Sequence, residues 1–206
     1  MKGFNAGALL LLAASCLSGC VESGSFTDER DGQVYDIITL RGQTWMARNL
    51  NYATLGGSTC AGDYESNCEK YGFLYTWDTA MTACPDGWRL PSRDDWDLLM
   101  QHADGRKSDN YGKYHDWSRA GEKLKAKTGW KKTSWGSDGN GMDRYGFCAL
   151  PGGGGYSTVG KGGNWWSSTE SYGTAYSRFM VSDSEGVGED DNSGKSTGLS
   201  VRCIKD

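Results

Sequence analysis

The N-terminal twenty residues constrain what the rest of the chain can fold into, because they direct it out of the cytoplasm. Lys2 precedes an apolar run over residues 8–14, and small residues follow the run. A charged cap, a short apolar core and a small-residue cleavage site together predict a signal peptide over residues 1–19. The run falls short of the ~20 residues needed to cross a bilayer. The remaining chain is therefore expected to fold in an oxidising compartment.

The residues around the predicted cleavage point resemble a lipobox, the bacterial motif in which lipid is attached to a cysteine. They are Leu17-Ser18-Gly19-Cys20. Acyl chains such as palmitate contribute ~0.8 kcal/mol per buried methylene, so two or three of them anchor a protein stably. We expect lipidation of Cys20 and a place in the cell envelope, at the outer membrane because Val21 rather than aspartate follows. The alternative is an ordinary secretory signal in which Cys20 is incidental.

One domain is expected after the signal peptide. Removing 19 of 206 residues leaves 187, which is enough for one sizeable core. Residues 20–33, the lipidated cysteine and a polar stretch, are predicted to form a short tether, and residues 34–206 the domain. Without Lys2 the mature chain has 21 basic and 26 acidic residues, a net charge of -5. This balance argues against nucleic acid as a partner, which needs a basic field.

Glycine and aromatic residues dominate the composition of the domain. The chain has 31 Gly, 9 Trp and 11 Tyr but only 3 Pro. Because each aromatic side chain buries a large area, a few of them can hold long glycine-rich loops in place. The composition thus favours a loop-rich domain over a helical bundle.

Five cysteines remain in the predicted domain: Cys60, Cys68, Cys84, Cys148 and Cys203. In an exported protein they are expected to form disulfides. Two bridges and one odd thiol allow about fifteen arrangements, and the sequence alone does not choose among them. Cys60 and Cys68 flank a polar loop that they can close locally, and Cys148 in an apolar run is interpreted as a buried free thiol rather than an intermolecular bridge. These two assignments leave Cys84 to pair with Cys203.

Regular structure is expected in short pieces. Residues 34–40 and 44–47 are rich in β-branched and aromatic residues around a turn, which predicts a hairpin. Ser92 with Asp95 three positions later resembles a capping box and predicts the start of a helix. A second helix is predicted over residues 119–127. Residues 71–83 fit a strand or a helical turn, the other strand candidates are residues 165–169, 175–181 and 199–204, and the longest predicted loops are residues 152–163 and 182–198.

Several segments together resemble, in order, the Fibrobacter succinogenes major paralogous domain. They are residues 26–32, 43–52, 71–77, 84–92, 145–153, 165–168 and 200–203, and the resemblance runs from Phe26 to Asp206. That family is similar to the C-type lectin-like and sulfatase-modifying-factor folds. The resemblance implies an α+β, C-type lectin-like single domain with short antiparallel strands, two or three helices and long Gly-rich loops. It also implies that Cys84 and Cys203 form the long-range bridge of such domains.

Catalytic chemistry is not indicated. His102 and His115 lie in no nucleophile or metalloprotease motif and are interpreted as exposed histidines. The late cysteines Cys148 and Cys203 are not the close pair that binds copper in the sulfatase-modifying oxidase, and the calcium-dependent sugar motifs of C-type lectins are absent. We therefore expect no enzyme and no cofactor.

Two other motifs were weighed as ligand sites. Gly194-Lys195-Ser196 looks like the end of a phosphate loop, but the spacing is wrong and the preceding acidic residues would repel phosphate. The second motif is a set of acidic residues and one asparagine between positions 183 and 192. It offers oxygen ligands for calcium but lacks EF-hand spacing, so a solvated loop is the favoured interpretation. Its members are Asp183, Glu185, Glu189, Asp190, Asp191 and Asn192, of which Asp183, Glu185, Asp190 and Asp191 are kept as weak metal candidates.

The aromatic residues remain as candidate binding groups. Those in apolar surroundings are predicted to be core: Trp45, Trp77, Trp88 and Trp96. One of the adjacent pair Trp165 and Trp166 is expected to face away from the core, since side chains alternate along a strand. The candidates for stacking on a ligand are Trp117, Trp130, Trp135, Tyr156 and Trp166. The alternative is that most of these rings clamp the glycine-rich loops.

These observations predict a non-enzymatic, membrane-anchored surface module that binds a polysaccharide or a surface protein. The first alternative is a structural or envelope-assembly protein that binds another protein, and the second is an uncharacterised enzyme.

Overall fold

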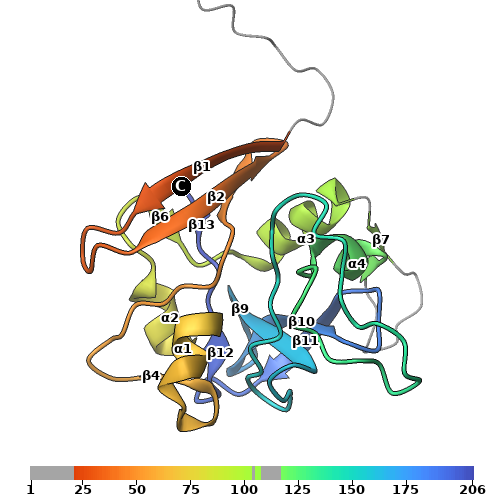
Figure 1. Ribbon diagram of the computed structural model, residues 1–206. Coiled ribbons are helices and arrows are strands. Elements are labelled where there is room, and N and C mark those ends of the chain that lie inside the picture. Colours follow the sequence, from red (N-terminus) through yellow and green to blue (C-terminus); the bar gives the residue numbers. More distant parts are fainter. Residues whose placement is uncertain (1–20, 104, 108–116) are drawn as a thin grey trace, which may run out of the picture.

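The computed structural model describes residues 21–103, 105–107 and 117–206 (Figure 1). The predicted hairpin is present and belongs to the first of its sheets. β2 (Val34–Leu40) and β3 (Gln43–Met46) pair antiparallel, and Arg41 and Gly42 turn between them with φ of 50° and 90°. The sheet order is β1-β2-β3-β13-β6. Thus β13 (Ile204–Lys205), near the C-terminus, lies between β3 and β6 (Trp88–Arg89), and the first and last described strands share one sheet.

The expected tether is largely a strand. β1 (Val21–Thr27) pairs with all seven residues of β2, so the prediction of a tether over residues 20–33 is wrong for these positions. Phe26 lies 5.1 Å from the ring of Trp88, and buried Asp28 forms a 2.7 Å ion pair with Arg30. β1 is an edge strand with mostly exposed side chains, so it shows no alternation of apolar and polar residues. Its backbone pairing with β2 makes it a strand, and the sequence pattern does not indicate that pairing.

The second sheet has the order β11-β10-β9-β12-β5-β4. Its strands are β11 (Gly188–Ser193), β10 (Thr174–Val181), β9 (Gly162–Ser171), β12 (Leu199–Ser200), β5 (Leu74–Tyr75) and β4 (Ser58–Thr59). All neighbours are antiparallel except β12 and β9. The predicted loop 182–198 contains β11, whose polar residues fit an edge position. The predicted strand 199–204 divides into β12 and β13, which belong to different sheets.

Four helices are described, one more than predicted: α1 (Glu65–Tyr71), α2 (Trp77–Ala83), α3 (Arg93–His102) and α4 (Ala120–Leu124). The capping box predicted for α3 is confirmed, since Ser92 and Asp95 bond each other's backbone N–H. The ambiguous residues 71–83 contain both β5 and α2. α4 is shorter than the predicted 119–127 because Lys125 is already extended. No helix in the described ranges is long and apolar enough to span a bilayer.

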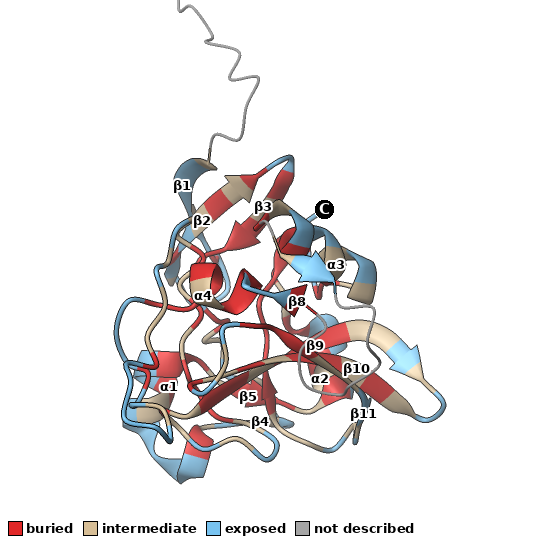
Figure 2. Cartoon of the chain, turned by 90° about the vertical axis from the view of Figure 1, so that its right-hand side faces the viewer, coloured by how far each residue is buried: buried red, intermediate tan, exposed pale blue. Residues whose placement is uncertain are grey.

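The buried strand β9 contributes to two hydrophobic clusters, and most of its residues are buried (Figure 2). Trp165 points into one cluster with Trp96 of α3, and Trp166 points into the other with Trp77 of α2. Both adjacent tryptophans are fully buried. The expectation that one faces outward is therefore wrong, because alternation along a strand exposes a residue only where one face is uncovered.

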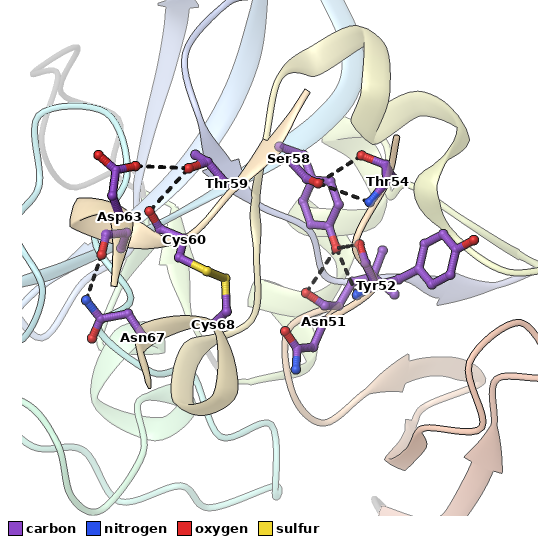
Figure 3. The surroundings of a disulfide bond; sticks show 12 residues. Asn51, Tyr52, Thr54, Ser58, Thr59, Cys60, Asp63, Asn67 and Cys68 are labelled. Carbon is purple, nitrogen blue, oxygen red and sulfur yellow. Dashed lines mark hydrogen bonds between the residues drawn. A yellow bond between two sulfur atoms is a disulfide. The ribbon is translucent and has the colours of Figure 1, made fainter. Parts of the chain in front are cut away.

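Two disulfides form. Cys84 bonds Cys203, and Cys60 bonds Cys68 across the short 3₁₀ turn Ala61–Asp63 and α1 (Figure 3). Cys148 is the free cysteine of the described chain, as predicted, but it is half-buried and lines a cavity between β2 and α1. Burial raises the pKa of its thiol. The architecture is α+β, with short and mostly antiparallel strands.

A short antiparallel pair completes the described elements. β7 (Arg106–Lys107) pairs with β8 (Trp117–Ser118), immediately before α4. Trp117 also forms a bridge with Val187, the residue before β11. This bridge connects the α4 region with the edge of the second sheet, where the candidate site lies.

Candidate functional site

Three of the five predicted stacking residues are buried, so their assignment as ligand contacts is wrong. Trp117, Trp130 and Trp166 are at most 5% exposed. Each indole N–H has a partner inside the fold: Trp117 donates to Asp97 Oδ1 at 3.2 Å, Trp130 to the Ala149 carbonyl at 3.0 Å, and Trp166 to the Tyr75 carbonyl at 2.7 Å. These rings clamp the loops, as the alternative interpretation held. The four predicted core tryptophans are buried as well.

The other two candidates are exposed on neighbouring loops. Trp135 is 90% exposed and Tyr156 is fully exposed. Their loops are joined by backbone and side-chain hydrogen bonds, since the Lys131 N–H donates to the Gly160 carbonyl at 2.7 Å and Lys161 Nζ to the Lys132 carbonyl at 2.6 Å. The structure therefore brings two aromatic candidates to one region of the surface.

A cavity of about 640 Å³ opens beside Tyr156. Its walls are residues 155–157, the end of β10, the edge strand β11 and the turn that follows β11. Besides Tyr156, the predicted residues Asp183, Asp190 and Asp191 line it, whereas Glu185 does not. The volume falls within the range of ~300–1,000 Å³ that is usual for small-ligand sites.

The glycine-rich wall of the cavity is fixed by close backbone contacts. Gly154 has φ +93°, and a Cβ there would lie 2.9 Å from the Gly198 carbonyl oxygen. The Asn164 side-chain amide donates to the Gly154 carbonyl at 2.9 Å. Glycine at 154 is required by both its backbone conformation and this approach. The Tyr156 side chain is consequently presented from a constrained loop.

The apolar side of the cavity comes from Phe179, which sequence reasoning missed. Phe179 pairs across the strands with Gly188, and a Cβ at 188 would lie 2.1 Å from the ring. The glycine lets the ring lie against the backbone of β11. The register between β10 and β11 decides this contact, and no local pattern in the sequence reports that register.

The carboxylates of the cavity are held by hydrogen-bond donors. The Ser134 N–H and hydroxyl donate to Asp183 at 2.8 and 2.5 Å, and these bonds keep the pKa of Asp183 below its usual value. The Ser193 hydroxyl donates to Asp190 Oδ2 at 2.9 Å. Because Trp135 follows Ser134, the loop carrying Trp135 is attached to the cavity through Asp183.

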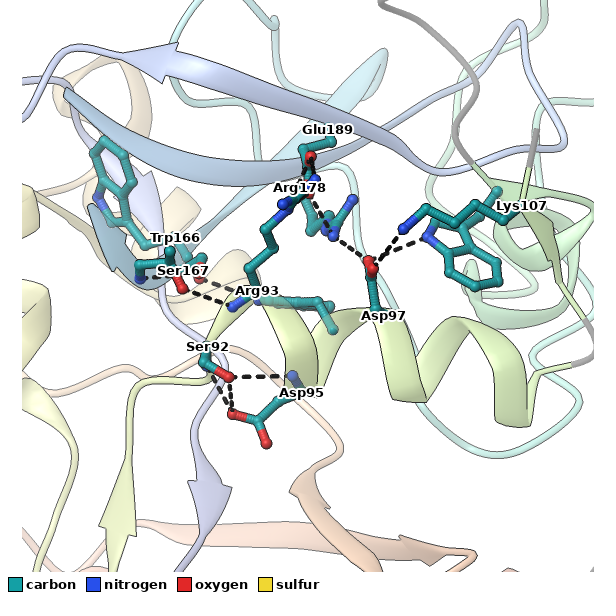
Figure 4. A network of polar contacts seen from close by, with 12 residues as sticks. Ser92, Arg93, Asp95, Asp97, Lys107, Trp166, Ser167, Arg178 and Glu189 are labelled. Carbon is teal, nitrogen blue, oxygen red and sulfur yellow. Dashed lines mark hydrogen bonds and ion pairs between the residues drawn. The ribbon is translucent and has the colours of Figure 1, made fainter. Parts of the chain in front are cut away.

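A fourth carboxylate that lines the cavity, Glu189, is neutralised by two arginine side chains (Figure 4). Arg93 of α3 pairs with it at 2.8 Å, and buried Arg178 of β10 pairs with it at 2.5 Å. Arg178 also pairs with Asp97, which accepts from Lys107 at 2.9 Å. The hydrogen bond with Glu189 raises the pKa of Arg93. This network ties α3 to β11 and holds the cavity wall in place.

The two histidines and the acidic loop residues were weighed in the sequence as catalytic or metal-binding groups, and neither role was favoured. Within the described ranges, no group of three or more His, Cys, Asp or Glu side chains is placed to hold a metal ion. His102 is half-buried at the end of α3 rather than exposed, and burial lowers its pKa. His115 and Cys20 lie outside the described residues. Asp183, Asp190 and Asp191 thus line one cavity without forming a metal cluster among the described residues.

Comparison with known proteins identifies the domain. The model of the Fibrobacter succinogenes major domain matches residues 38–205, from within β2 to within β13. No curated protein and no solved structure matches the chain. The matched residues include both disulfides and the whole cavity. Since the match covers well over half of the 206 residues, the chain belongs to the Fibrobacter succinogenes major domain family.

Proposed function

We propose that this chain is a lipid-anchored surface protein whose lectin-like domain binds a glycan, without catalysis, in the cavity beside Tyr156. One observation carries the proposal: a fully exposed aromatic ring stands at a cavity whose other walls combine carboxylate, amide and hydroxyl groups with the apolar side chains of Phe179, Val181 and Leu199. An aromatic face packs against the apolar face of a sugar ring, while the polar groups bond its hydroxyls.

The fixed walls of the cavity support recognition by a preformed site. The Gly154 contact holds the loop of Tyr156, and the ion pairs of Glu189 hold β11. A ligand then pays little conformational entropy to order the protein on binding. Such a site suits a repeating neutral or basic saccharide presented at the cell surface.

A binding role is favoured over hydrolysis by the state of the carboxylates. Glycosidases need one carboxylic acid that stays protonated near neutral pH, next to a second carboxylate. Here Glu189 is paired with two arginines, and hydrogen bonds lower the pKa of Asp183. Neither is suited to act as the general acid.

The lectin-like assignment rests on the arrangement of the chain ends. β13 lies between β3 and β6 in the first sheet, and the Cys84–Cys203 disulfide links the middle of the chain to this strand region. The long loop between α4 and β9, the loop after β10 and the edge strand β11 then carry the candidate site. These features agree with the C-type lectin-like fold proposed from the sequence.

The proposed anchor gives the cavity an outward orientation. β1 begins at Val21, one residue after Cys20, so lipid on Cys20 would hold the start of β1 against the membrane. In both Figure 1 and Figure 2 the start of β1 lies at the top, while β9, β10 and β11 lie toward the bottom. The cavity would face away from the membrane, where a glycan reaches it.

Replacing Cys20 with alanine tests the anchor. The variant is expected to lose incorporation of labelled palmitate and to move from the membrane fraction to the soluble fraction, because no acyl chain remains. Cys148→Ala, which removes the free thiol of the domain, should change neither result. A Cys20→Ala protein that stays in the membrane fraction would contradict lipid anchoring.

The glycan site is tested by substitution of Tyr156. Tyr156→Ala is expected to weaken binding of the full-length protein to a glycan identified by array and polysaccharide pulldown by about tenfold, the ~1.4 kcal/mol typical of an aromatic anchor. Tyr172→Ala is the matched control, since Tyr172 is equally exposed at the β9–β10 turn and does not line the cavity. Titration on immobilised glycan measures both affinities.

The same experiments distinguish the alternative role. Trp135 is 90% exposed beside the cavity, and tryptophan is a frequent anchor at protein interfaces. A blank array and a blank pulldown would reject glycan binding. Cross-linking through Trp135 to one envelope protein in cells would then support the assembly function.

A further inference from the structure

The net charge of the cavity is strongly negative. Asp183, Asp190 and Asp191 line it and form no ion pair with any described lysine or arginine. Among the described residues that line the cavity, none is lysine or arginine. Glu189 is neutralised by Arg93 and Arg178, whereas Asp183 forms no ion pair and has Lys161, which does not line the cavity, as its nearby positive charge. Three carboxylates therefore line one ligand space without an ion pair to hold them.

From this charge we infer that the ligand is an amino sugar carrying protonated amines, an inference that rests on the glycan-binding function proposed above. Uronate, sulfate and phosphate groups would be repelled by the three carboxylates. A neutral sugar would gain hydrogen bonds but no Coulomb attraction. A primary ammonium gains both, because it donates up to three hydrogen bonds and is attracted to each carboxylate.

The aromatic ring adds to the same preference. A cation over the face of an exposed tyrosine is attracted by the ring quadrupole. Tyr156 stands at the mouth of the cavity that also contains Asp183 and Asp191. A ring that stacks on the sugar and carboxylates that bind its amine are thus available to one saccharide unit.

The carboxylates are held in place before any ligand arrives. Ser134 donates two hydrogen bonds to Asp183, and Ser193 and the Asn192 N–H donate to Asp190 at 2.9 and 3.1 Å. Asp191 is exposed and is left to contact a ligand. Preorganised acceptors raise affinity because they need no reordering on binding.

An amino sugar fits the cavity better than a basic peptide does. Hydroxyl and amide groups accompany the carboxylates, among them Ser157, Asn164, Asn192 and Thr197. These groups both donate and accept hydrogen bonds, as sugar hydroxyls require. A lysine side chain would present one ammonium on an apolar stem and leave most of these groups without a partner.

The inference is tested with three oligosaccharides of equal length: a glucosamine oligomer, its fully N-acetylated form and an oligouronate. The full-length protein is expected to bind the glucosamine oligomer at least about fivefold more tightly than the acetylated form at low salt, the ratio for one exposed ion pair of ~1 kcal/mol. It should not bind the oligouronate. The preference should shrink in high salt, since the Debye length falls from ~10 Å at 0.1 M to ~3 Å at 1 M.

A charge-neutralising variant gives the matched comparison. Asp191→Asn should lower affinity for the glucosamine oligomer about fivefold and leave affinity for the acetylated form unchanged. Asp94→Asn makes the same charge change on exposed Asp94 of α3, outside the cavity, and should change neither affinity. Circular dichroism of both variants confirms that they are folded.

Three other results would each reject the amino-sugar inference. Equal affinity for the amine and acetylated oligomers rejects the amino-sugar inference and leaves the proposed glycan-binding function standing. Binding to none of a wide set of glycans rejects both. Oligolysine that binds more tightly than the glucosamine oligomer, and weakens equally with Asp191→Asn, identifies a basic peptide as the ligand and rejects the amino sugar.

Discussion

Replacing Cys84 and Cys203 together with alanine is expected to lower the free energy of unfolding by about 5 kcal/mol in the chain-entropy model. The two cysteines are 119 residues apart, so reduction releases a long loop in the unfolded chain. Cys203 is buried between β12 and β13, where the second core cluster meets the first sheet. Urea denaturation followed by tryptophan fluorescence measures the change.

The local disulfide is the matched control. Removing Cys60 and Cys68, which are only 8 residues apart, is expected to cost about 2.5 kcal/mol by the same relation. The ratio of the two losses is the critical result, because both variants remove one bond. A smaller loss for the Cys84 and Cys203 variant would show that the long-range bridge does not set the stability of the domain.

Arg202→Ala is expected to lower the free energy of unfolding by about 4 kcal/mol, as large buried side chains do when a cavity and unpaired acceptors are left. Arg202 is fully buried, and its guanidinium lies 4.4 Å over the ring of Phe147. It donates to Asn49 Oδ1 at 2.8 Å and to the Phe147 carbonyl at 2.5 Å. No carboxylate of the described chain pairs with it, and burial lowers its pKa to about 10.

The physical reason is that this arginine joins three segments. Met46 of β3, Asn49 and the Phe147 loop all accept from one guanidinium, and Trp165 donates to the same Asn49 oxygen at 2.8 Å. Arg144→Ala, an exposed arginine in the same loop, should change stability by less than ~0.5 kcal/mol. An Arg202→Ala protein with the wild-type urea midpoint would show that the network contributes nothing net.

Local signals in the sequence were sufficient to predict several elements of secondary structure. Ser92 and Asp95 predicted the start of α3, and the turn at Arg41 and Gly42 predicted the β2–β3 hairpin, because capping and tight turns depend on residues a few positions apart. Both disulfides and the free Cys148 were also predicted. The resemblance supported the long-range pair, which composition alone does not single out.

Edge strands and aromatic exposure could not be predicted in this way. β1 and β11 are polar or small at most positions, and pairing of their backbones with β2 and β10 makes them strands. Trp130 looked accessible in a chain of lysines and glycines, yet its indole is enclosed and donates to the Ala149 carbonyl. Burial depends on what the rest of the fold places over a side chain, and neighbours in sequence do not report it.

The sequence by itself determined the family, the α+β class and the residue types available for a ligand, and an exported setting stays a prediction. Only the tertiary structure decided which of those residues meet. Tyr156, Phe179 and Asp191 come from a loop and two strands, and they face one cavity because the β10–β11 register and the loop contact at Gly154 place them there. Contacts of this kind arise from packing between distant segments, which a local pattern does not encode.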